Sequence, residues 1–200
     1  PRPQNQRQIQ MMIGLFGYFR RHASNFSKTA APITSLLKKG TTFIWTKEQE
    51  DAFIALKEEL CKRTMLASPD FSKQIFLYVD ASAMALGGCL SQKGEDGVEE
   101  PLGFASRRLK KSEENYSVTQ KEMLGIVWAT KQFSHFLFNT HFIVYTDHKC
   151  LQYLLTCKNK KPMFERWALS LSEFNMEIRY IKGTENGASD ALSRIICNNG

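Results

Sequence analysis

Apolar residues recur at helical spacing in the first third of the chain. In residues 8–21, and again in residues 30–38, they return every three or four positions, which predicts two amphipathic helices. Thr46 and Gln49 form a capping box, and the apolar stripe that follows it predicts a third helix reaching residue 60. Helices of this kind are typical of a small packed segment.

Beyond Ser68-Pro69-Asp70, which breaks the helical pattern, the sequence changes to strands and longer helices. Strands are predicted at residues 75–80, 87–92, 102–106, 141–146 and 175–181. Helices are predicted at residues 117–137, 149–155, 164–174 and 188–194. The order βββαβααβα predicts an α/β fold with a mixed five-stranded sheet flanked by helices. An antiparallel meander of three strands is followed by parallel strands reached through helices.

The same break predicts two parts, a mainly helical segment at residues 1–68 and an α/β domain at residues 69–197. Gly87 and Gly88 stand together in a predicted strand, where they suit a backbone that is closely approached or bent. The chain begins at Pro1 without an initiator Met or the apolar core of a signal peptide. We therefore expect it to be a piece of a longer protein.

Composition places the chain among soluble proteins. With 42% hydrophobic and 24% charged residues it can bury a substantial core, and no apolar run approaches membrane-spanning length. Its five cysteines, an odd number without a Cys-x-x-Cys pair, argue against a disulfide framework and favour an intracellular, cytoplasmic location. A zinc site made of His148, Cys150 and Cys157 would match no usual ligand spacing, which favours incidental thiols.

The net charge of +7 is unevenly placed along the chain. Residues 1–70 carry 11 basic and 6 acidic residues, a net +5, and the remaining 130 residues carry only +2. Basic surface of this kind favours a polyanionic partner such as a nucleic acid.

One acidic residue ends an apolar strand. Residues 75–79 are apolar or aromatic, and Asp80 follows them either as a turn cap or as a metal ligand. A ligand needs further carboxylates: Asp147 ends another predicted strand, while Glu122 and Asp190 lie near the starts of two predicted helices. All four can converge at one edge of the sheet, where divalent cations would have to neutralise them.

Each acid also has a structural explanation of its own. Thr119 and Glu122 match a capping box, Asp147 could cap the helix after it, and Asp190 could cap its own helix. The joint placement of all four on one predicted fold favours metal ligation. His148 is interpreted as a neighbour that shapes the site, because Mg²⁺ prefers oxygen ligands.

At these residues the sequence resembles the reverse transcriptase of gypsy-type LTR retrotransposons, from the thumb region through the ribonuclease H domain, over nearly the whole chain. Each matching phrase is weak alone, but their order and spacing together are specific. They are Gly17-Tyr18-Phe19-Arg20-Arg21, Phe43-Ile44-Trp45-Thr46, Val79-Asp80-Ala81-Ser82, Phe104-Ala105-Ser106-Arg107, Asn115-Tyr116-Ser117 with Lys121-Glu122, Tyr145-Thr146-Asp147-His148-Lys149 and Asp190-Ala191-Leu192-Ser193-Arg194.

The resemblance implies a ribonuclease H-like fold, preceded by a thumb and connection segment, that cleaves the RNA strand of RNA:DNA hybrids with two Mg²⁺ ions, which Mn²⁺ can replace. On the matching positions Asp80 would bridge both ions, Asp190 would hold the ion that activates water, and Glu122 and Asp147 would hold the other. The implied partners are the hybrid duplex and the rest of a Pol polyprotein, with polymerase palm and fingers upstream and integrase downstream. No membrane is implied, and an active element would place the chain in a virus-like particle.

Three features depart from or limit the resemblance. Val118 and Thr119 stand where ribonucleases H of the wider class often carry the Asn and Gln that contact the minor groove. Residues 183–189 lack the His that many of them carry before the last Asp. Both departures concern substrate grip and turnover and leave the metal ligands intact. No Tyr-x-Asp-Asp motif occurs, so we do not expect this chain to synthesise DNA by itself.

Basic residues are the candidates for contact with a hybrid duplex, because such duplexes are held mainly through phosphates and 2′-hydroxyls. The alternative for each cluster is a solvated loop. The candidates are Arg107, Arg108, Lys110 and Lys111, then Lys158, Lys160 and Lys161, and Arg20 and Arg21 at the end of the first helix.

Two non-catalytic functions stay open on sequence alone. The fold could serve as a connection-type scaffold that no longer cleaves, although such a domain would be expected to lack the four acids. It could also be a nucleic-acid-binding module, whose affinity for a hybrid would fall with salt and would not depend on metal.

Overall fold

The computed structural model describes all residues except 1, 19–25, 64–66, 155–161 and 196–200. The chain divides into two compact units, Pro1–Met65 and Leu66–Gly200. Within the described residues, no helix is both long and apolar enough to cross a membrane.

The first unit contains the three predicted helices, α1 (Gln6–Tyr18), α2 (Phe26–Ser35) and α3 (Lys47–Arg63). At the predicted capping box before α3, the Thr46 N–H donates to Gln49 Oε1 (3.0 Å), and the Thr46 hydroxyl accepts from the Glu48 N–H (3.3 Å). Helix α2 begins and ends earlier than predicted, and it includes Pro32. The three helices share one core, formed by Ile9, Phe16, Phe26, Ala30, Ile33, Leu36, Ala52, Phe53 and Leu56.

The second unit is built on one five-stranded sheet. Its strands are β1 (Ile75–Ala81), β2 (Ala85–Lys93), β3 (Glu99–Arg108), β4 (Phe142–Thr146) and β5 (Met176–Tyr180). They lie in the order β3-β2-β1-β4-β5. Strands β1, β2 and β3 pair antiparallel, while β4 pairs parallel with β1 and β5 parallel with β4. The predicted mixed sheet is therefore confirmed.

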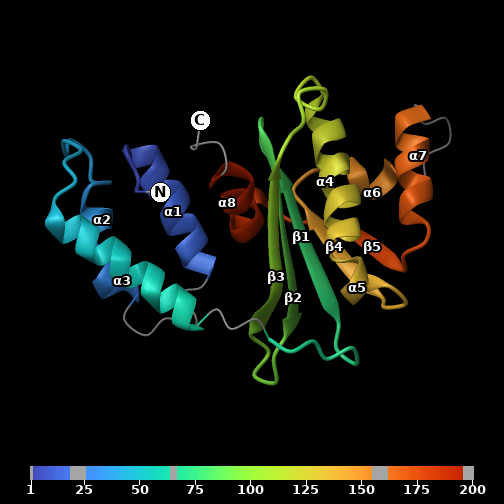
Figure 1. Cartoon of the computed structure of the whole chain (residues 1–200), viewed down its shortest axis with the longest axis horizontal. Helices are drawn as coiled ribbons and strands as arrows, with labels where there is room; N and C mark the ends of the chain where they lie inside the picture. Colours follow the sequence, from blue (N-terminus) through green and yellow to red (C-terminus); the bar gives the residue numbers. More distant parts are fainter. Residues whose placement is uncertain (1, 19–25, 64–66, 155–161, 196–200) are drawn as a thin grey trace. The chain divides into compact units, whose positions relative to one another are not determined.

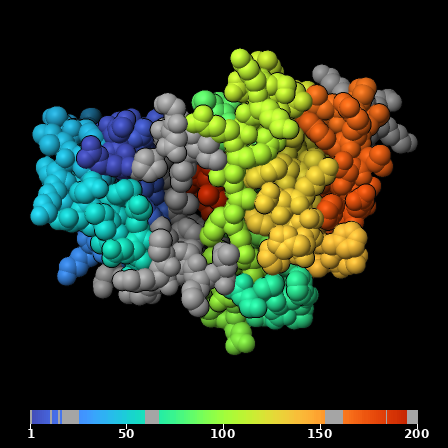
Figure 2. All heavy atoms as spheres, in the orientation of Figure 1, coloured from blue at the N-terminus to red at the C-terminus, as the bar shows by residue number. Residues whose placement is uncertain are grey.

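Helices cover both faces of this sheet. They are α4 (Val118–Gln132), α5 (Ser134–Leu137), α6 (Leu151–Leu154), α7 (Pro162–Leu171) and α8 (Gly187–Ile195), with a single 3₁₀ turn at Gly183–Glu185 before α8. Helices α4 and α7 lie on one side of the sheet and α8 on the other (Figure 1). In the space-filling view the atoms of β3, α4, α5 and α7 form one continuous visible surface of the second unit (Figure 2).

Alternation along β1 gives the strand two different faces. Ile75, Leu77 and Val79 are fully buried in the core that includes Met123 and Ile126 of α4. The intervening residues, and with them Asp80, point to the opposite face, because successive side chains of a strand alternate. The hydrophobic pattern thus fixes which side of β1 carries the acid.

The predicted helix at residues 117–137 is interrupted once, at Phe133. Helix α4 ends at Gln132, Phe133 leaves helical geometry (φ −101°, ψ 17°), and the short α5 covers the rest of the predicted range. The ring of Phe133 packs against Gly88 of β2 and Gly103 of β3, where a Cβ atom would lie 3.6 Å and 2.8 Å from ring carbons. The break depends on this tertiary contact, which the helical pattern of the sequence does not contain.

The prediction that the Gly87–Gly88 backbone is closely approached is confirmed. A Cβ atom on Gly87 would lie 2.4 Å from the carbonyl oxygen of Ser189 and 2.6 Å from the backbone nitrogen of Ser193, both in α8. Contacts this short with backbone atoms leave no room for a side chain. The glycine therefore allows α8 to pack directly on β2.

Gly87→Ala is expected to destabilise the second unit by about 1–3 kcal/mol, because either α8 or β2 must move to admit the methyl group. Urea unfolding measures the loss. Gly14→Ala in α1 is the matched control: a Cβ there meets nothing within 4 Å. It should stabilise the first unit by about 0.5–1 kcal/mol, as alanine does in a helix. A Gly87→Ala chain as stable as the parent would contradict the close packing of α8.

Candidate metal centre

Asp80 and Asp147 lie side by side because two parallel strands end together. Tyr78 of β1 is in register with Tyr145 of β4, and each acid stands two residues further along its own strand direction. Asp80 is buried at 5% exposure, and Asp147, which directly follows β4, is more open. This strand pairing brings the two acids together at one edge of the sheet.

Glu122 reaches the same edge from helix α4. The helix is capped by Ser117, whose hydroxyl accepts from the Gln120 N–H while the Gln120 side chain accepts from the Ser117 N–H. The capping box proposed for Glu122 is therefore wrong: the helix starts two residues earlier, and Glu122 lies past its cap. Gly125 lets α4 approach β1, since a Cβ there would lie 2.9 Å from Val79 Cγ1.

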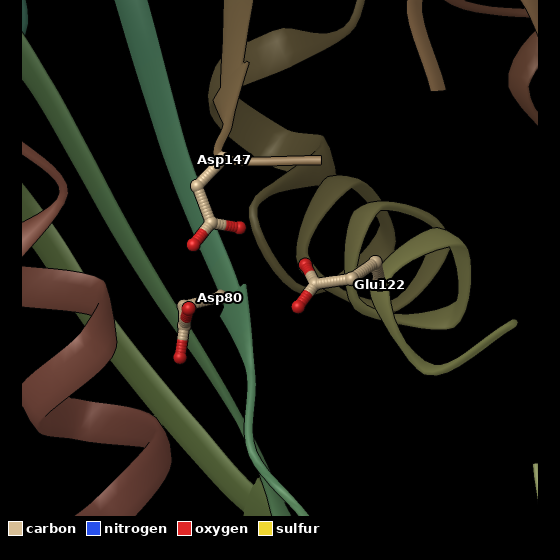
Figure 3. A group of neighbouring side chains, drawn as sticks. All are labelled: Asp80, Glu122 and Asp147. Carbon is tan, nitrogen blue, oxygen red and sulfur yellow. The ribbon is translucent and has the colours of Figure 1, made fainter. Parts of the chain in front are cut away.

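Three of the four predicted acids form one group. One carboxylate oxygen from each of Asp80, Glu122 and Asp147, here called the acidic trio, lies within 4.8 Å of the others. Figure 3 shows the three side chains pointing toward one another from β1, α4 and the end of β4. In the part of the chain that the structure describes, no other group of three or more His, Cys, Asp or Glu side chains has metal-ligand geometry.

The electrostatics of the acidic trio are unfavourable without a cation. Burial, with the negative charges of Asp190 and Asp147, raises the pKa of Asp80 to about 6, although a hydrogen bond from Ser193 opposes the shift. Burial, with the charges of Asp80 and Asp147, raises the pKa of Glu122 to about 9. Desolvation and like charge both disfavour the ionised forms.

Glu122 also carries an unsatisfied atom. Its Oε1 accepts from the Ala81 N–H (3.3 Å), but its Oε2 is buried without a hydrogen-bond partner among the described residues. A buried, unpaired carboxylate oxygen is costly. Carboxylate oxygens are the ligands that Mg²⁺ and Mn²⁺ prefer, so a divalent cation fits both the missing partner and the excess negative charge.

Asp190 stands beside the acidic trio and not within it. Helix α8 begins at Gly187, so Asp190 lies inside the helix and does not cap it. Its Oδ1 accepts from Arg194 Nε (2.6 Å) and forms an ion pair with the same guanidinium, one helical turn away. Its negative charge still contributes to the raised pKa of Asp80, which places the fourth acid at the border of the site.

Two residues around the site were not assigned a contact from the sequence. Ser193 of α8 donates a short hydrogen bond to Asp80 Oδ2. Thr119 Oγ1 lies 3.0 Å from His148 Nε2, which joins the start of α4 to the residue after Asp147. The spacing of Ser193 three residues after Asp190 was the available signal, but a strand-to-helix contact over more than a hundred residues cannot be inferred from spacing.

The predicted nucleic-acid contacts fall into three groups. The Arg107 guanidinium forms a bidentate ion pair with the Glu113 carboxylate (N···O distances of 2.7 and 3.2 Å) and lies over the Trp128 ring. Its charge is therefore paired within the protein. The other three residues of that cluster are exposed: Arg108, Lys110 and Lys111. The remaining candidates lie outside the described residues: Lys158, Lys160, Lys161, Arg20 and Arg21.

Comparison with known proteins places this arrangement in a family. The family described as "RNase H-like domain found in reverse transcriptase" matches residues 70–174. The Retrovirus-related Pol polyprotein from transposon 297 of Drosophila melanogaster is 43% identical over 196 residues, which cover 98% of this chain and 18% of that polyprotein. The Transposon Tf2-3 polyprotein of Schizosaccharomyces pombe is 37% identical over 198 residues, covering 97% and 15%. The chain thus spans less than a fifth of the length of these curated relatives.

A solved structure of the foamy viral protease-reverse transcriptase, in complex with double-stranded DNA, shares the fold. It superposes with a TM-score of 0.72 at 20% identity, over 91% of this chain and 40% of that one. The fold therefore agrees with the sequence relationship. The chain belongs to the family of RNase H-like domains found in reverse transcriptases, and over nearly its whole length it is similar to the Pol polyproteins of retrotransposons.

Proposed function

We propose that this chain is a metal-dependent ribonuclease H that hydrolyses the RNA strand of RNA:DNA hybrids, leaving a 3′-hydroxyl and a 5′-phosphate. The observation that carries this function is the convergence of the acidic trio around the unpaired Oε2 of Glu122. In a non-catalytic scaffold, a buried cluster of carboxylates would only destabilise the fold. A two-metal hydrolase requires such a cluster to bind its ions.

Four side chains would hold two Mg²⁺ ions, for which Mn²⁺ can substitute. Asp80, the innermost acid, would be shared by both ions. Glu122 and Asp147 would hold one of them, and Asp190 would hold the other after leaving Arg194. When bound, the pair of ions supplies an activated water and stabilises the leaving oxygen of the phosphodiester.

The substrate would lie on the exposed side of Asp147. A Cβ on Gly183 would lie 3.2 Å from Asp147 Oδ2, so this glycine keeps the mouth of the site free of a side chain. Of the predicted contacts, Arg108, Lys110 and Lys111 are exposed and would bind phosphates of the duplex. Such contacts make the affinity for the duplex fall steeply with salt.

We further propose that the first unit is the thumb and connection segment of a reverse transcriptase. The polymerase palm and fingers would precede it and an integrase would follow the ribonuclease H domain, in a polyprotein that works in the cytoplasm or in a virus-like particle. The length of the curated relatives, of which this chain covers 15–18%, leaves room for those parts.

The test is incubation of the whole chain with an end-labelled RNA:DNA hybrid. We expect cleavage of the RNA strand with Mg²⁺ or Mn²⁺ and none with EDTA, and no cleavage of RNA:RNA or DNA:DNA duplexes of the same sequence. Glu122→Gln should be inactive. Glu114→Gln is the matched control, since Glu114 is an exposed glutamate before α4. Salt-dependent binding of the hybrid without cleavage in any metal would instead assign a binding module or scaffold.

A further inference from the structure

Helix α8 is joined to the sheet beside Asp80 by polar side chains that are buried. Asn186, Ser189 and Ser193 are exposed by only 1%, 0% and 0%. Apolar residues usually fill such an interface, and a buried polar group is retained only where its hydrogen bonds are satisfied. The partners of these three residues therefore indicate what the interface is built to hold.

Two of the bonds anchor α8 to the backbone around Asp80. The Asn186 side-chain amide donates to the carbonyl oxygen of Val79 (2.9 Å). The Ser82 hydroxyl donates to the carbonyl oxygen of Ser193 (2.7 Å). One anchor thus lies on each side of Asp80 in the sequence, and the two end on α8 and on Asn186, the residue before it.

The close contact at Gly87 fixes the position of α8 on strand β2. Gly87 is the register partner of Asp80 across β1 and β2. At the same residue the backbone atoms of Ser189 and Ser193 approach so closely that a Cβ atom could not be placed. Helix α8 can therefore neither slide along β2 nor lift from it without breaking contacts next to Asp80.

The third bond reaches the carboxylate itself. Ser193 Oγ lies within hydrogen-bond distance of Asp80 Oδ2 and of the Asp190 carbonyl oxygen (2.9 Å). A hydroxyl has one proton, and an ionised carboxylate is the stronger acceptor, so the proton belongs on the bond to Asp80. A carboxylate that accepts one such bond still has Oδ1 and a lone pair on Oδ2 for coordination.

We propose that Ser193 is a positioning residue for the metal centre: its hydroxyl fixes the plane of the Asp80 carboxylate, so that α8 sets the affinity for divalent ions independently of the Asp190 side chain. This role rests on the proposed function. Outer residues that orient a metal ligand typically change metal affinity about 10–100-fold when they are removed.

The experiment compares Ser193→Ala with Ser189→Ala in the whole chain. Ser189 is the matched control, because its hydroxyl is equally buried in α8 but bonds to Asn186 and not to Asp80. Mn²⁺ affinity is measured by titration calorimetry without nucleic acid, and the Mg²⁺ concentration for half-maximal hybrid cleavage is measured separately. We expect Ser193→Ala to weaken Mn²⁺ binding about tenfold or more. Ser189→Ala should bind Mn²⁺ as the parent does, and saturating Mg²⁺ should restore most of the cleavage by Ser193→Ala.

Further outcomes decide the assignment. Equal Mn²⁺ affinity of Ser193→Ala and the parent would overturn it, and so would equal losses in the two serine variants, which would make Ser193 structural only. If Ser193→Ala does not fold, Ser193→Cys, which keeps the volume but is a weak donor, carries the same comparison. A parent chain that binds Mn²⁺ more tightly than Ser193→Ala but cleaves no hybrid would refute the proposed function and leave the positioning role standing.

Discussion

Asp80→Asn is expected to abolish hybrid cleavage and, at the same time, to stabilise the protein. Asp80 is the acid that both ions would share, and a metal-bound carboxylate is worth several kcal/mol of transition-state stabilisation, which corresponds to a loss on the order of 10³-fold or more. Cleavage of a labelled hybrid under single-turnover conditions measures the loss.

The gain in stability follows from the environment of the acid. Burial raises the pKa of Asp80 to about 6 from an ordinary 3.8, so at pH 8 the ionised carboxylate opposes folding in the absence of metal. Asparagine removes the charge beside Glu122 and Asp147 and keeps an oxygen that can accept from Ser193. The metal-free variant should be about 1–3 kcal/mol more stable than the parent in urea.

Asp51→Asn is the control for both measurements, because Asp51 is an exposed residue of α3. It should leave cleavage unchanged and shift the free energy of unfolding by less than about 0.5 kcal/mol. An Asp80→Asn protein that is less stable than the parent would show that Asp80 is a structural residue. The metal-centre assignment would then lose its electrostatic basis.

Without divalent ions, the free energy of unfolding is expected to fall as the pH rises toward 9. Asp80 has its pKa raised to about 6, and Glu122 has its pKa raised to about 9 from an ordinary 4.5. Below about pH 4 these acids are protonated in both the folded and the unfolded chain and make no difference. Above that pH the unfolded chain releases these protons, while the folded chain keeps them until the pH nears the raised pKa values. The free energy of unfolding therefore decreases as the pH rises to about 9.

Glu122→Gln isolates this effect from the titration of other groups. The difference in free energy of unfolding between Glu122→Gln and the parent should increase from pH 5 to pH 9, reaching on the order of 3 kcal/mol. Urea titrations in EDTA at several pH values measure it, with Glu114→Gln, a change at an exposed glutamate, as the control. A difference that stays flat would mean that Glu122 is ionised freely in the folded protein.

Magnesium should reverse the loss. A cation that binds only the folded protein raises the melting temperature by mass action, and it competes with the protons on the carboxylates. At one fixed Mg²⁺ concentration, the increase in melting temperature should therefore be larger at pH 9 than at pH 6, because proton competition raises the apparent Kd at the lower pH. An equal shift at both pH values would place the bound ion away from the acidic trio.

The sequence by itself determined the architecture of the second unit and the positions of the two strand-end acids. Ile75, Leu77 and Val79 alternate on a strand whose other face carries Asp80, and the order of elements requires β4 to be parallel to β1. These features are local or follow from connection rules, because a strand's period and a crossover helix leave few alternatives. The motif resemblance then indicated which acids belong to one site.

Only the tertiary structure decided how those acids are held. The break after α4 at Phe133 depends on space above Gly88 and Gly103, and the close packing of α8 on β2 depends on Gly87. The bond from Ser193 to Asp80 joins residues 113 positions apart. Contacts between elements distant in sequence are set by packing of the whole core, so spacing and periodicity cannot reveal them, although it is these contacts that orient the carboxylates.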